Sequence, residues 1–373
     1  MKKFICMLLA MAFLASGAAS CASEGFSVAA KGAVLIDAAS GRVLFGQNEN
    51  ARYPMASTTK IMTALLALEN CALDEEVTAS ENANGVPGTS IYLGVGETLT
   101  MEQMLYGLLL RSGNDAAVAI AEHVSGSVAD FAALMNKRAV ELDADAHYEN
   151  PHGLDADGHE ASALALARIF RQAMQNEDFR RITGTKQTTI PWIGNEFSRV
   201  LTNKNRLLTT YEGATGGKTG YTSDAGRCLV FSAKREGMEL IGVVLSCPSW
   251  FEEAERMLDY GFENYHLKTP LVSGQTACET AVWDGMAGTV AAVAETDLCA
   301  AVGNGETWRV EYDFPGGVHA PVAAGQAIGT ATLYVENAPV AETKLLAAQS
   351  VERRDLASAL KRLLTRWALL FQS

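Results

Sequence analysis

The sequence predicts an α+β fold, followed by a small β-sandwich and a C-terminal amphipathic helix. Two observations lead to this fold class. Residues 30–44 and 227–246 have strand character and enclose a helical middle, so strands from both ends of that segment are expected to share one sheet. Residues 269–348 then contain short Val, Ala and Thr runs broken by Gly and Pro, a pattern typical of a small all-β unit.

The first residues are typical of a secretory signal peptide. Two lysines precede an apolar run at residues 4–14, which is too short to span a bilayer as a mature helix. Small residues at positions 18–22 suit signal peptidase. We expect residues 1–22 to be removed and the protein to be exported, while Cys21 leaves a lipoprotein alternative open.

The mature chain is expected to begin with a hairpin at residues 30–44 that turns around residues 37–41. A later hairpin joins strands 227–234 and 239–246, and the domain is expected to end near Leu267, so that it spans residues 23–268. Between the hairpins, apolar residues at helical spacing predict helices at residues 57–69, 99–110, 116–124, 131–142 and 164–174.

The predicted β-sandwich spans residues 269–349, and residues 350–373 return to a helical period. Leucines, Trp367 and Phe371 form one stripe of that terminal helix, with five cationic residues off it or at its edge. Such a stripe beside cations fits the interface of an anionic bilayer, so we expect residues 350–373 to bind a membrane surface. A terminal helix packed on its own domain is the alternative.

Composition narrows the class of function. The formal net charge of −13 argues against a nucleic-acid partner, because it leaves no broad basic face. About 350 mature residues are more than one core usually serves, which supports two units. The five mature cysteines show no C-x-x-C or Cys/His ligand spacing, so we expect no metal and no cofactor. Whether Cys228 and Cys247 oppose one another across the second hairpin stays open.

The first candidate motif is Ser57 with Lys60. Ser57 stands where the irregular segment 52–56 turns into a helix, so its hydroxyl lies at the positive end of the helix dipole. Lys60 follows three residues later on the same face of the first turn. A lysine acts as a base only with a depressed pKa, which burial and a neighbouring cation such as Lys218 produce. Taken alone, the pair also fits a helix cap and a solvated lysine.

Two further motifs follow in the chain. Ser112 and Asn114 belong to a Ser-Gly-Asn turn between two helices, from which side chains can point into a cleft. Lys218, Thr219 and Gly220 are predicted to start an edge strand, where the ammonium and the hydroxyl hold a carboxylate and the glycine lets substrate backbone approach. Nucleophile, base, hydroxyl relay, amide and carboxylate anchor together predict acyl transfer from a peptide with a free carboxylate.

With these motifs, the chain resembles the serine-type D-alanyl-D-alanine carboxypeptidases, the low-molecular-mass penicillin-binding proteins. The resemblance covers nearly the whole mature chain. Its segments are residues 55–69, 94–117, 150–159, 202–208 and 216–226. Two departures stand out: Met55 precedes Ala56 where the family commonly has Pro, and Glu160-Ala161-Ser162 replaces a small-hydroxyl cluster.

The resemblance implies the penicillin-recognising serine transpeptidase/β-lactamase-like fold and removal of the terminal D-Ala from peptidoglycan stem pentapeptides at the outer face of the bacterial cytoplasmic membrane. β-Lactams are then expected as covalent inhibitors. By motif, Ser57 is the acylated nucleophile and Lys60 its base. Ser112 and Asn114 form the second catalytic motif. Lys218 and Thr219, with Gly220, bind substrate, and the N–H groups of Ser57 and Tyr221 form the oxyanion hole.

Other functions stay in view. A class A β-lactamase shares the motifs but needs a deacylating Glu, and the chain has no Glu-x-x-Leu-Asn string between the second and third motifs. A metallo-carboxypeptidase would use His147, His152 and His159, whose spacing matches no helical ligand face. A D,D-endopeptidase of the same family is a third alternative. A catalytically silent envelope-binding module would have lost a motif, and all three are intact.

Overall fold

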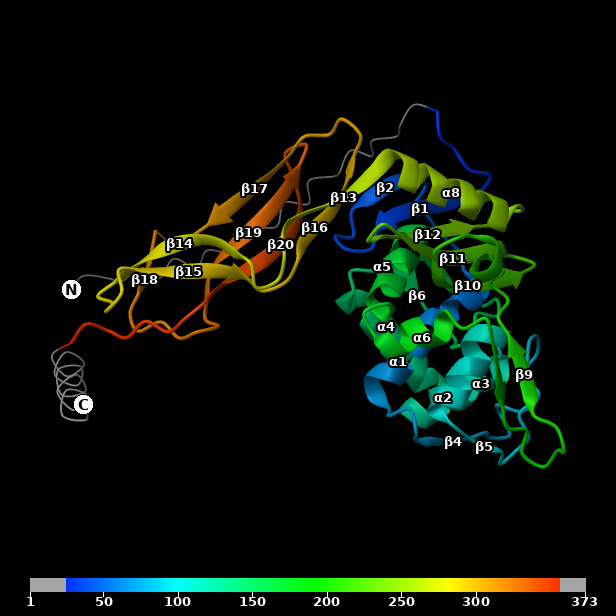
Figure 1. Ribbon diagram of the computed structural model, residues 1–373. Helices are drawn as coiled ribbons and strands as arrows, with labels where there is room; N and C mark the ends of the chain where they lie inside the picture. Colours follow the sequence, from blue (N-terminus) through cyan, green and yellow to red (C-terminus); the bar gives the residue numbers. More distant parts are fainter. Residues whose placement is uncertain (1–24, 315, 356–373) are drawn as a thin grey trace, which may run out of the picture.

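The computed structural model describes residues 25–314 and 316–355, which form two units joined end to end (Figure 1). The first unit, residues 25–264, combines a sheet with helices, and the second unit, residues 265–355, is built from strands. The predicted signal peptide lies outside the described residues. Within the described part, no helix by itself is long and apolar enough to cross a bilayer, although α3 (Asn114–Ser125) and α4 (Val128–Glu141), bent by 82°, meet the criterion as a pair.

A five-stranded antiparallel sheet organises the first unit, in the order β10-β11-β12-β1-β2. The prediction that both ends of the segment share one sheet is therefore confirmed. The β11–β12 hairpin turns at Glu236 and Gly237, which both have positive φ, as a tight two-residue hairpin turn requires. The strands are β1 (Gly32–Asp37), β2 (Val43–Gln47), β10 (Ala214–Thr222), β11 (Gly226–Arg235) and β12 (Met238–Leu245).

Helices cover both faces of this sheet (Figure 1). On one face, α5 (Ala163–Ala173) packs against β1 and β12, and α1 (Lys60–Asn70) and α3 pack behind it in the larger hydrophobic core. On the other face, α8 (Trp250–Asn264) buries Phe251, Ala254 and Leu258 against β11 and β12 in a second core. The sequence analysis named no helix at α8, and the first unit closes with it.

The predicted helix at residues 99–110 is shorter and less regular than expected. It consists of α2 (Met101–Tyr106), which Thr100 and Gln103 begin with a reciprocal capping box, and the π-helical turn η2 (Gly107–Arg111). The remaining elements of the first unit are β3 (Arg52–Pro54), η1 (Ala56–Thr59), β4 (Glu76–Thr78), β5 (Thr98–Thr100), β6 (Ala146–His147), β7 (Glu160–Ser162), α6 (Glu177–Thr183), β8 (Gln187–Ile190), β9 (Arg199–Thr202) and α7 (Leu207–Thr210).

The second unit consists of a six-stranded sheet, in the order β17-β19-β20-β15-β14-β18, and the strand pair β13-β16. β16 packs against β19 and β20 around a core of Leu, Val and Ala side chains, including Leu298, Leu333 and Leu345. The strands are β13 (Tyr265–Leu271), β14 (Thr276–Trp283), β15 (Thr289–Ala294), β16 (Leu298–Gly303), β17 (Trp308–Asp313), β18 (Val318–His319), β19 (Ala327–Val335) and β20 (Ala338–Ala347).

Residues 350–355 belong to this second unit. Val351 is 3 % exposed and pairs with Val322 in an isolated bridge, and the backbone of Glu352 accepts a hydrogen bond from Met286. The prediction that an amphipathic helix begins at residue 350 is therefore wrong for these six residues, because their backbone bonds to residues 284–286 and to Val322. The rest of that predicted helix, residues 356–373, lies outside the described residues.

The two units are joined without an intervening loop. β13 begins at Tyr265, directly after α8 ends at Asn264, and continues across the predicted domain boundary at residues 268 and 269. Arg42 of the first unit binds the carboxylate of Glu306 with both terminal nitrogens and the carbonyl of Ala301, 2.8 Å away. The Ala301 N–H donates to Asp37 at 3.0 Å. These bonds orient the second unit against the first.

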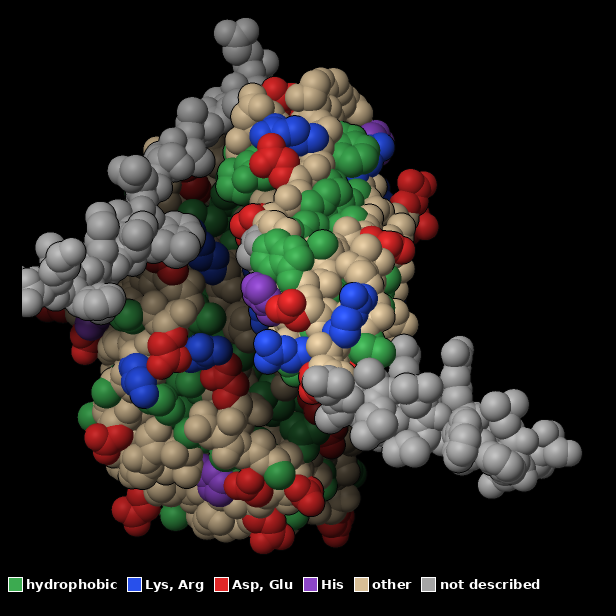
Figure 2. All heavy atoms as spheres, turned by 90° about the vertical axis from the view of Figure 1, so that its left-hand side faces the viewer, with side chains coloured by type: hydrophobic (Ala, Val, Ile, Leu, Met, Phe, Trp, Pro, Cys, Tyr) green, Lys and Arg blue, Asp and Glu red, His purple; other side chains and the backbone are tan. Residues whose placement is uncertain are grey.

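Two further features of the described residues are their surface charge and the state of their cysteines. On the face drawn in Figure 2, the described acidic and basic side chains are intermixed. The five cysteines of the described residues are free thiols. Cys228 packs in the larger core of the first unit and Cys247 in the core under α8, so these two side chains lie on opposite faces of the sheet. A disulfide between them does not form in this structure.

Candidate active site

The three sequence motifs meet in one cleft of the first unit. Its volume is about 360 Å³, and six of the eight predicted site residues line it. The other two, Lys60 and Lys218, are buried directly beneath. The lining consists of Ser57, Gly88, Thr89, Ser112, Asn114, Gly153, Leu154, Lys204, Thr219, Gly220, Tyr221, Thr222 and Trp250.

Ser57 lies in the 3₁₀ turn η1, just before α1 begins at Lys60. The preceding residue, Ala56, has a φ of 49°, in the left-handed region that costs a non-glycine residue about 1–3 kcal/mol. Two glycines pack against this strained turn. A Cβ on Gly153 would lie 2.0 Å from the Ala56 carbonyl oxygen, and one on Gly220 would lie 3.0 Å from the Ser57 nitrogen. Gly220 therefore lets the edge strand pack against the Ser57 turn, which adds to its predicted role toward substrate.

Lys60 is fully buried and makes three hydrogen bonds. Its Nζ lies 2.9 Å from Ser57 Oγ, 2.7 Å from Asn114 Oδ1 and 2.6 Å from the carbonyl oxygen of His152. The amide and carbonyl oxygens can only accept, so Nζ donates to both of them, and in the neutral form of the amine these two bonds use both of its hydrogens. The lone pair of that amine is then left for the Ser57 hydroxyl, which is the one neighbour able to donate.

The electrostatic surroundings of Lys60 favour its neutral form. Burial lowers the pKa of Lys60 well below its usual value, and the nearby cations Lys218 and Lys204 lower it further, against a smaller opposing effect of Asp115. An amine without its proton at neutral pH is what a general base requires. The predicted effect of the Lys218 charge on the pKa of Lys60 is therefore present in this structure.

The second motif joins the end of η2 to the start of α3. Ser112 ends η2 with a φ of 65°, and its Oγ accepts a hydrogen bond from Lys218 Nζ at 3.0 Å. Asn114 begins α3, and its Nδ2 donates to the Pro87 carbonyl at 2.6 Å, which fixes the amide so that its oxygen points at Lys60. Next to it, buried Asp115 accepts the backbone N–H groups of Ile91 and Leu93, which holds that loop beside the cleft.

The third motif lies in β10, which is the edge strand of the sheet as predicted, although the motif stands in the middle of this strand and not at its start. Lys218 is 2 % exposed and Thr219 7 %, whereas Tyr221 is 65 % exposed. Besides Ser112, the Lys218 ammonium donates to the Thr219 carbonyl at 2.7 Å. Burial, followed by the charge of Lys204, lowers the pKa of Lys218 to about 7.

Sequence reasoning missed the role of the loop at residues 150–154. Asn150 Oδ1 accepts the N–H groups of His152 and Gly153, and this turn presents the His152 carbonyl to Lys60. A backbone carbonyl that accepts a hydrogen bond leaves no pattern of side chains in the sequence. The Asn-Pro-His-Gly string at residues 150–153 could have indicated this loop, but the sequence analysis used it only as part of the family resemblance.

Lys204 is the second missed residue. It lines the cleft and lowers the pKa of both Lys60 and Lys218, and its own pKa is lowered by burial and by Arg111. None of the lining residues is acidic. The cleft is therefore a cationic site in an acidic protein, which suits a substrate with a carboxylate and offers no glutamate for β-lactamase-type deacylation.

The three histidines of the metallo-carboxypeptidase alternative do not converge. His147 pairs with Glu149, and His152 Nδ1 accepts the Leu154 N–H. Both nitrogens of His159 are engaged, with Thr59 Oγ1 and with the Glu149 N–H. Burial lowers the pKa of His159 to about 4 and that of His152 to about 3, so both rings are neutral near pH 7.

Comparison with known proteins agrees with this geometry. Residues 18–249 match the D-alanyl-D-alanine carboxypeptidase family, which is more than half of the chain. The chain belongs to this family. Residues 265–353 match the penicillin-binding protein 5 C-terminal domain, which corresponds to the second unit.

Relatives span nearly the same length. The chain is 33 % identical over 350 residues to D-alanyl-D-alanine carboxypeptidase DacF of Bacillus subtilis, covering 91 % of this chain and 90 % of that protein. It is 31 % identical to DacD of Salmonella typhimurium, covering 93 % of each. Penicillin-binding protein 5 of Haemophilus influenzae superimposes with a TM-score of 0.74 at 29 % identity, covering 88 % of this chain and 99 % of that one.

The family membership establishes the class of reaction. The protein is a serine-type D-alanyl-D-alanine carboxypeptidase with the penicillin-binding protein fold, and its family acts on the cell wall. Neither departure from the family pattern lines the cleft: Met55 is the N-cap of η1, and Glu160 to Ser162 form β7 beside β3. The identification therefore confirms the resemblance on which the expected fold and activity rested.

Proposed function

We propose that Ser57 is the nucleophile and Lys60 the general base by which this enzyme removes the terminal D-alanine from peptidoglycan stem peptides. The observation that supports this assignment is the bonding of Lys60. Two of its three neighbours accept hydrogens and cannot donate, so a neutral Lys60 amine can receive a proton only from Ser57.

In the proposed acylation, Ser57 Oγ attacks the carbonyl carbon of the penultimate D-alanine while its proton passes to Lys60 Nζ. The oxygen of that carbonyl becomes negative and is held by the backbone N–H groups of Ser57 and Tyr221. The C–N bond to the terminal D-alanine then breaks. Its nitrogen takes the proton from Lys60, with the Ser112 hydroxyl as relay, and D-alanine leaves as a free amino acid.

Deacylation repeats these transfers with water. A water oxygen attacks the ester carbon, one water proton moves to Lys60, and that proton returns to Ser57 Oγ as the ester bond breaks. Lys218, Thr219 and Lys204 supply cationic and hydroxyl groups for the substrate carboxylate before acylation. The absence of an acidic residue among those lining the cleft favours this symmetrical use of Lys60 over a β-lactamase mechanism. The same site accepts a β-lactam carbonyl, with the ring amide in place of the leaving D-alanine.

The test is intact-mass spectrometry after incubation with penicillin, combined with an assay of D-Ala release. Wild-type protein should gain one penicillin mass on the peptide that contains Ser57. Ser57→Ala should lose both the adduct and D-Ala release, while Ser127→Ala, an N-cap change at the start of α4, should keep both. An adduct on Ser57→Ala at the wild-type level would show that another residue is acylated.

We further propose that the mature enzyme is exported and held peripherally at the outer face of the membrane. This proposal is supported by the lysines and apolar run within residues 1–22 and by the Leu, Trp and cationic residues within 356–373. We propose that a catalytic domain begins at residue 23 and that a β domain follows it, with the boundary between residues 264 and 265 instead of 268 and 269, because β13 begins at Tyr265 and pairs within the second unit.

A further inference from the structure

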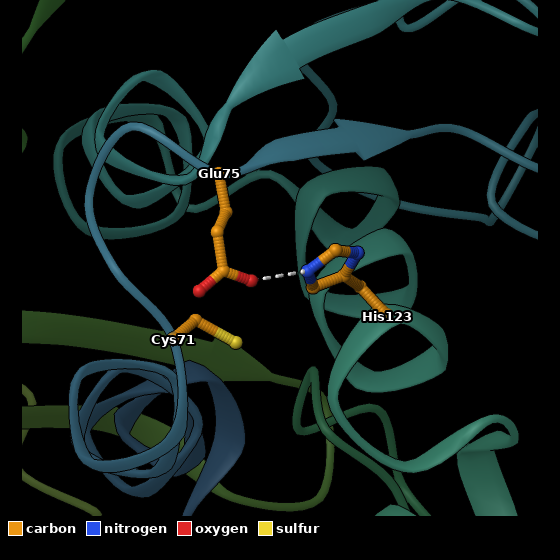
Figure 3. Close-up of side chains that lie close together, drawn as sticks. All are labelled: Cys71, Glu75 and His123. Carbon is orange, nitrogen blue, oxygen red and sulfur yellow. Dashed lines mark hydrogen bonds and ion pairs between the residues drawn. The ribbon is translucent and has the colours of Figure 1, made fainter.

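We propose that Cys71, Glu75 and His123 form a binding site for a Zn²⁺ ion, remote from the cleft. The three side chains come from the end of α1, the following loop and the last turn of α3, and they point toward one another (Figure 3). The thiol sulfur, a carboxylate oxygen and an imidazole nitrogen all lie within 4.8 Å of one another. Nothing in the proposed peptidase mechanism uses these groups.

The spacing is close to what a tetrahedral zinc site needs. Zn–S bonds of about 2.3 Å and Zn–N or Zn–O bonds of about 2.0–2.2 Å place neighbouring ligand atoms roughly 3.3–3.8 Å apart. Glu75 Oε2 and His123 Nε2 are already 3.2 Å apart. A small opening of this pair, by rotation of two side chains, admits the ion.

The local backbone orients the carboxylate in advance. The Glu75 N–H donates to the Ala72 carbonyl, and Glu75 Oε1 accepts the Ala72 N–H at 2.6 Å, so the loop after Cys71 is closed on itself. One oxygen, Oε2, is left to face His123. Such a partner on the second oxygen is typical of carboxylates that bind metals.

The donor set and the charge environment both favour a thiophilic divalent cation. Sulfur, nitrogen and oxygen donors together suit Zn²⁺ rather than Mg²⁺ or Ca²⁺, which prefer oxygen alone. Cys71 is the C-cap of α1 and His123 lies in the last turn of α3, so the negative ends of two helix dipoles meet at this point. The side chains of His123 and Glu75 are 27 % and 44 % exposed, which leaves a fourth position for water.

A histidine–glutamate ion pair is the simpler interpretation, and the chain contains a natural comparison for it. His147 and Glu149 form such a pair at 2.9 Å on an exposed strand, and no third ligand joins them among the described residues. Of these two pairs, the one at His123 alone has a thiol within reach among the described residues. We therefore expect the site at His123 to bind the metal ion and the pair at His147 not to bind it.

The site escaped sequence analysis because its ligands are not contiguous. Cys71 and Glu75 straddle a loop, and His123 follows much later on another helix, so no C-x-x-C or Cys/His spacing results. Packing of α1 against α3 brings them together. Both helices begin at the catalytic cleft, with Lys60 and Asn114, and both end at the proposed ion, which would cross-link their far ends.

The experiment is a titration of purified, metal-free full-length protein with Co²⁺, followed by competition with Zn²⁺. Co²⁺ reports thiolate ligation by a charge-transfer band in the near ultraviolet and tetrahedral geometry by intense visible bands. Wild-type protein should bind one Co²⁺ per chain with both signals, and Zn²⁺ should displace it. Cys71→Ser and His123→Gln should each weaken binding on the order of a hundredfold, because one of three protein ligands is lost.

Matched controls separate this site from adventitious binding. Cys299→Ser removes a part-buried free thiol of the second unit, and His147→Gln removes the comparison histidine, so both should retain the wild-type spectrum. Glu75→Gln changes an exposed side chain and tests the third ligand even if a Cys71 variant folds poorly. Penicillin labelling of every variant checks that the first unit is folded.

Two results would overturn the proposal. One is the absence of a thiolate-to-cobalt band in wild-type protein at saturating Co²⁺. The other is a band that persists in Cys71→Ser and disappears in Cys299→Ser or His147→Gln. As a second readout, Zn²⁺ should raise the thermal unfolding temperature of the wild-type protein and leave that of Cys71→Ser unchanged, since an ion bound only by the folded state stabilises it.

Discussion

Replacing Lys218 by arginine keeps a positive charge at this position but removes the titration of that charge near neutral pH. Burial and Lys204 lower the pKa of Lys218 to about 7, so the ammonium loses its proton as the pH rises through neutrality. Arginine stays charged throughout. If the ammonium holds the substrate carboxylate, only the wild-type enzyme should lose substrate affinity through this group in alkaline solution.

The size of the effect follows from the pKa. At a pKa of about 7, the protonated fraction falls from about one half at pH 7 to roughly 1 % at pH 9, a loss of about 50-fold in kcat/KM for the wild-type enzyme. The pKa of Lys60 is already well below its usual value, so its neutral fraction changes in the opposite, favourable direction. Lys218→Arg should show a lower plateau, because the larger side chain is overpacked by about 1–3 kcal/mol, but a nearly flat profile.

The assay is release of D-alanine from a peptide ending in D-Ala-D-Ala, measured from pH 6 to 10. Thermal unfolding at each pH excludes loss of the fold. Lys204→Arg is the matched control, since it keeps the neighbouring charge and leaves Lys218 free to titrate. If the wild-type enzyme and Lys218→Arg lose activity in parallel above pH 7, another group titrates and the assignment of Lys218 as carboxylate anchor fails.

Three other changes test separate parts of the structure. Lys60→Arg should abolish labelling by fluorescent penicillin with the fold retained, since a guanidinium cannot accept the serine proton; labelling at half the wild-type rate or more would contradict this role. Gly153→Ala should destabilise the fold by roughly 3 kcal/mol or more in urea unfolding, because its Cβ meets the Ala56 carbonyl at 2.0 Å. Gly158→Ala has a similar φ, and its Cβ would meet only His147 Cδ2, at an ordinary contact distance of 3.7 Å, so about 1 kcal/mol is expected there, and equal losses would contradict the steric explanation. Removal of residues 356–373 should abolish flotation with anionic liposomes and preserve peptide hydrolysis, whereas a truncated protein that still floats would refute the anchor.

Much of the candidate site was predictable because its chemistry is local in sequence. Ser57 and Lys60 share one helical turn, so spacing alone placed them on a common face. Ser112 and Asn114 flank one glycine in a turn, from which side chains were expected to point into a cleft. The order of the three motifs along the chain then indicated that they belong to one active site. The hairpin strands β11 and β12 were equally local, with turn residues between two β-rich runs.

What sequence reasoning missed depends on tertiary contacts. The His152 carbonyl acts through its backbone, and its placement depends on Asn150 and on the left-handed Gly153. Lys204 influences the site by charge across the cleft, which no spacing reports. Residues 350–355 were assigned to the terminal helix from sequence, yet Val351 is buried and forms an isolated β-bridge with Val322, so a tertiary contact outweighed a weak local preference.

The direct passage from α8 into β13 has a consequence for where catalysis takes place. The bond between Arg42 and Glu306 across the junction restricts rotation of the second unit against the first, and the last described segment, residues 350–355, lies at the end of the second unit that is far from the first unit (Figure 1). Its strand β19 alone has nine residues, an extension of about 30 Å. If the enzyme is held at a surface through the residues after 355, as proposed, the length of the second unit contributes to the distance between the cleft and that surface. This distance would then limit which stem peptides the enzyme can hydrolyse.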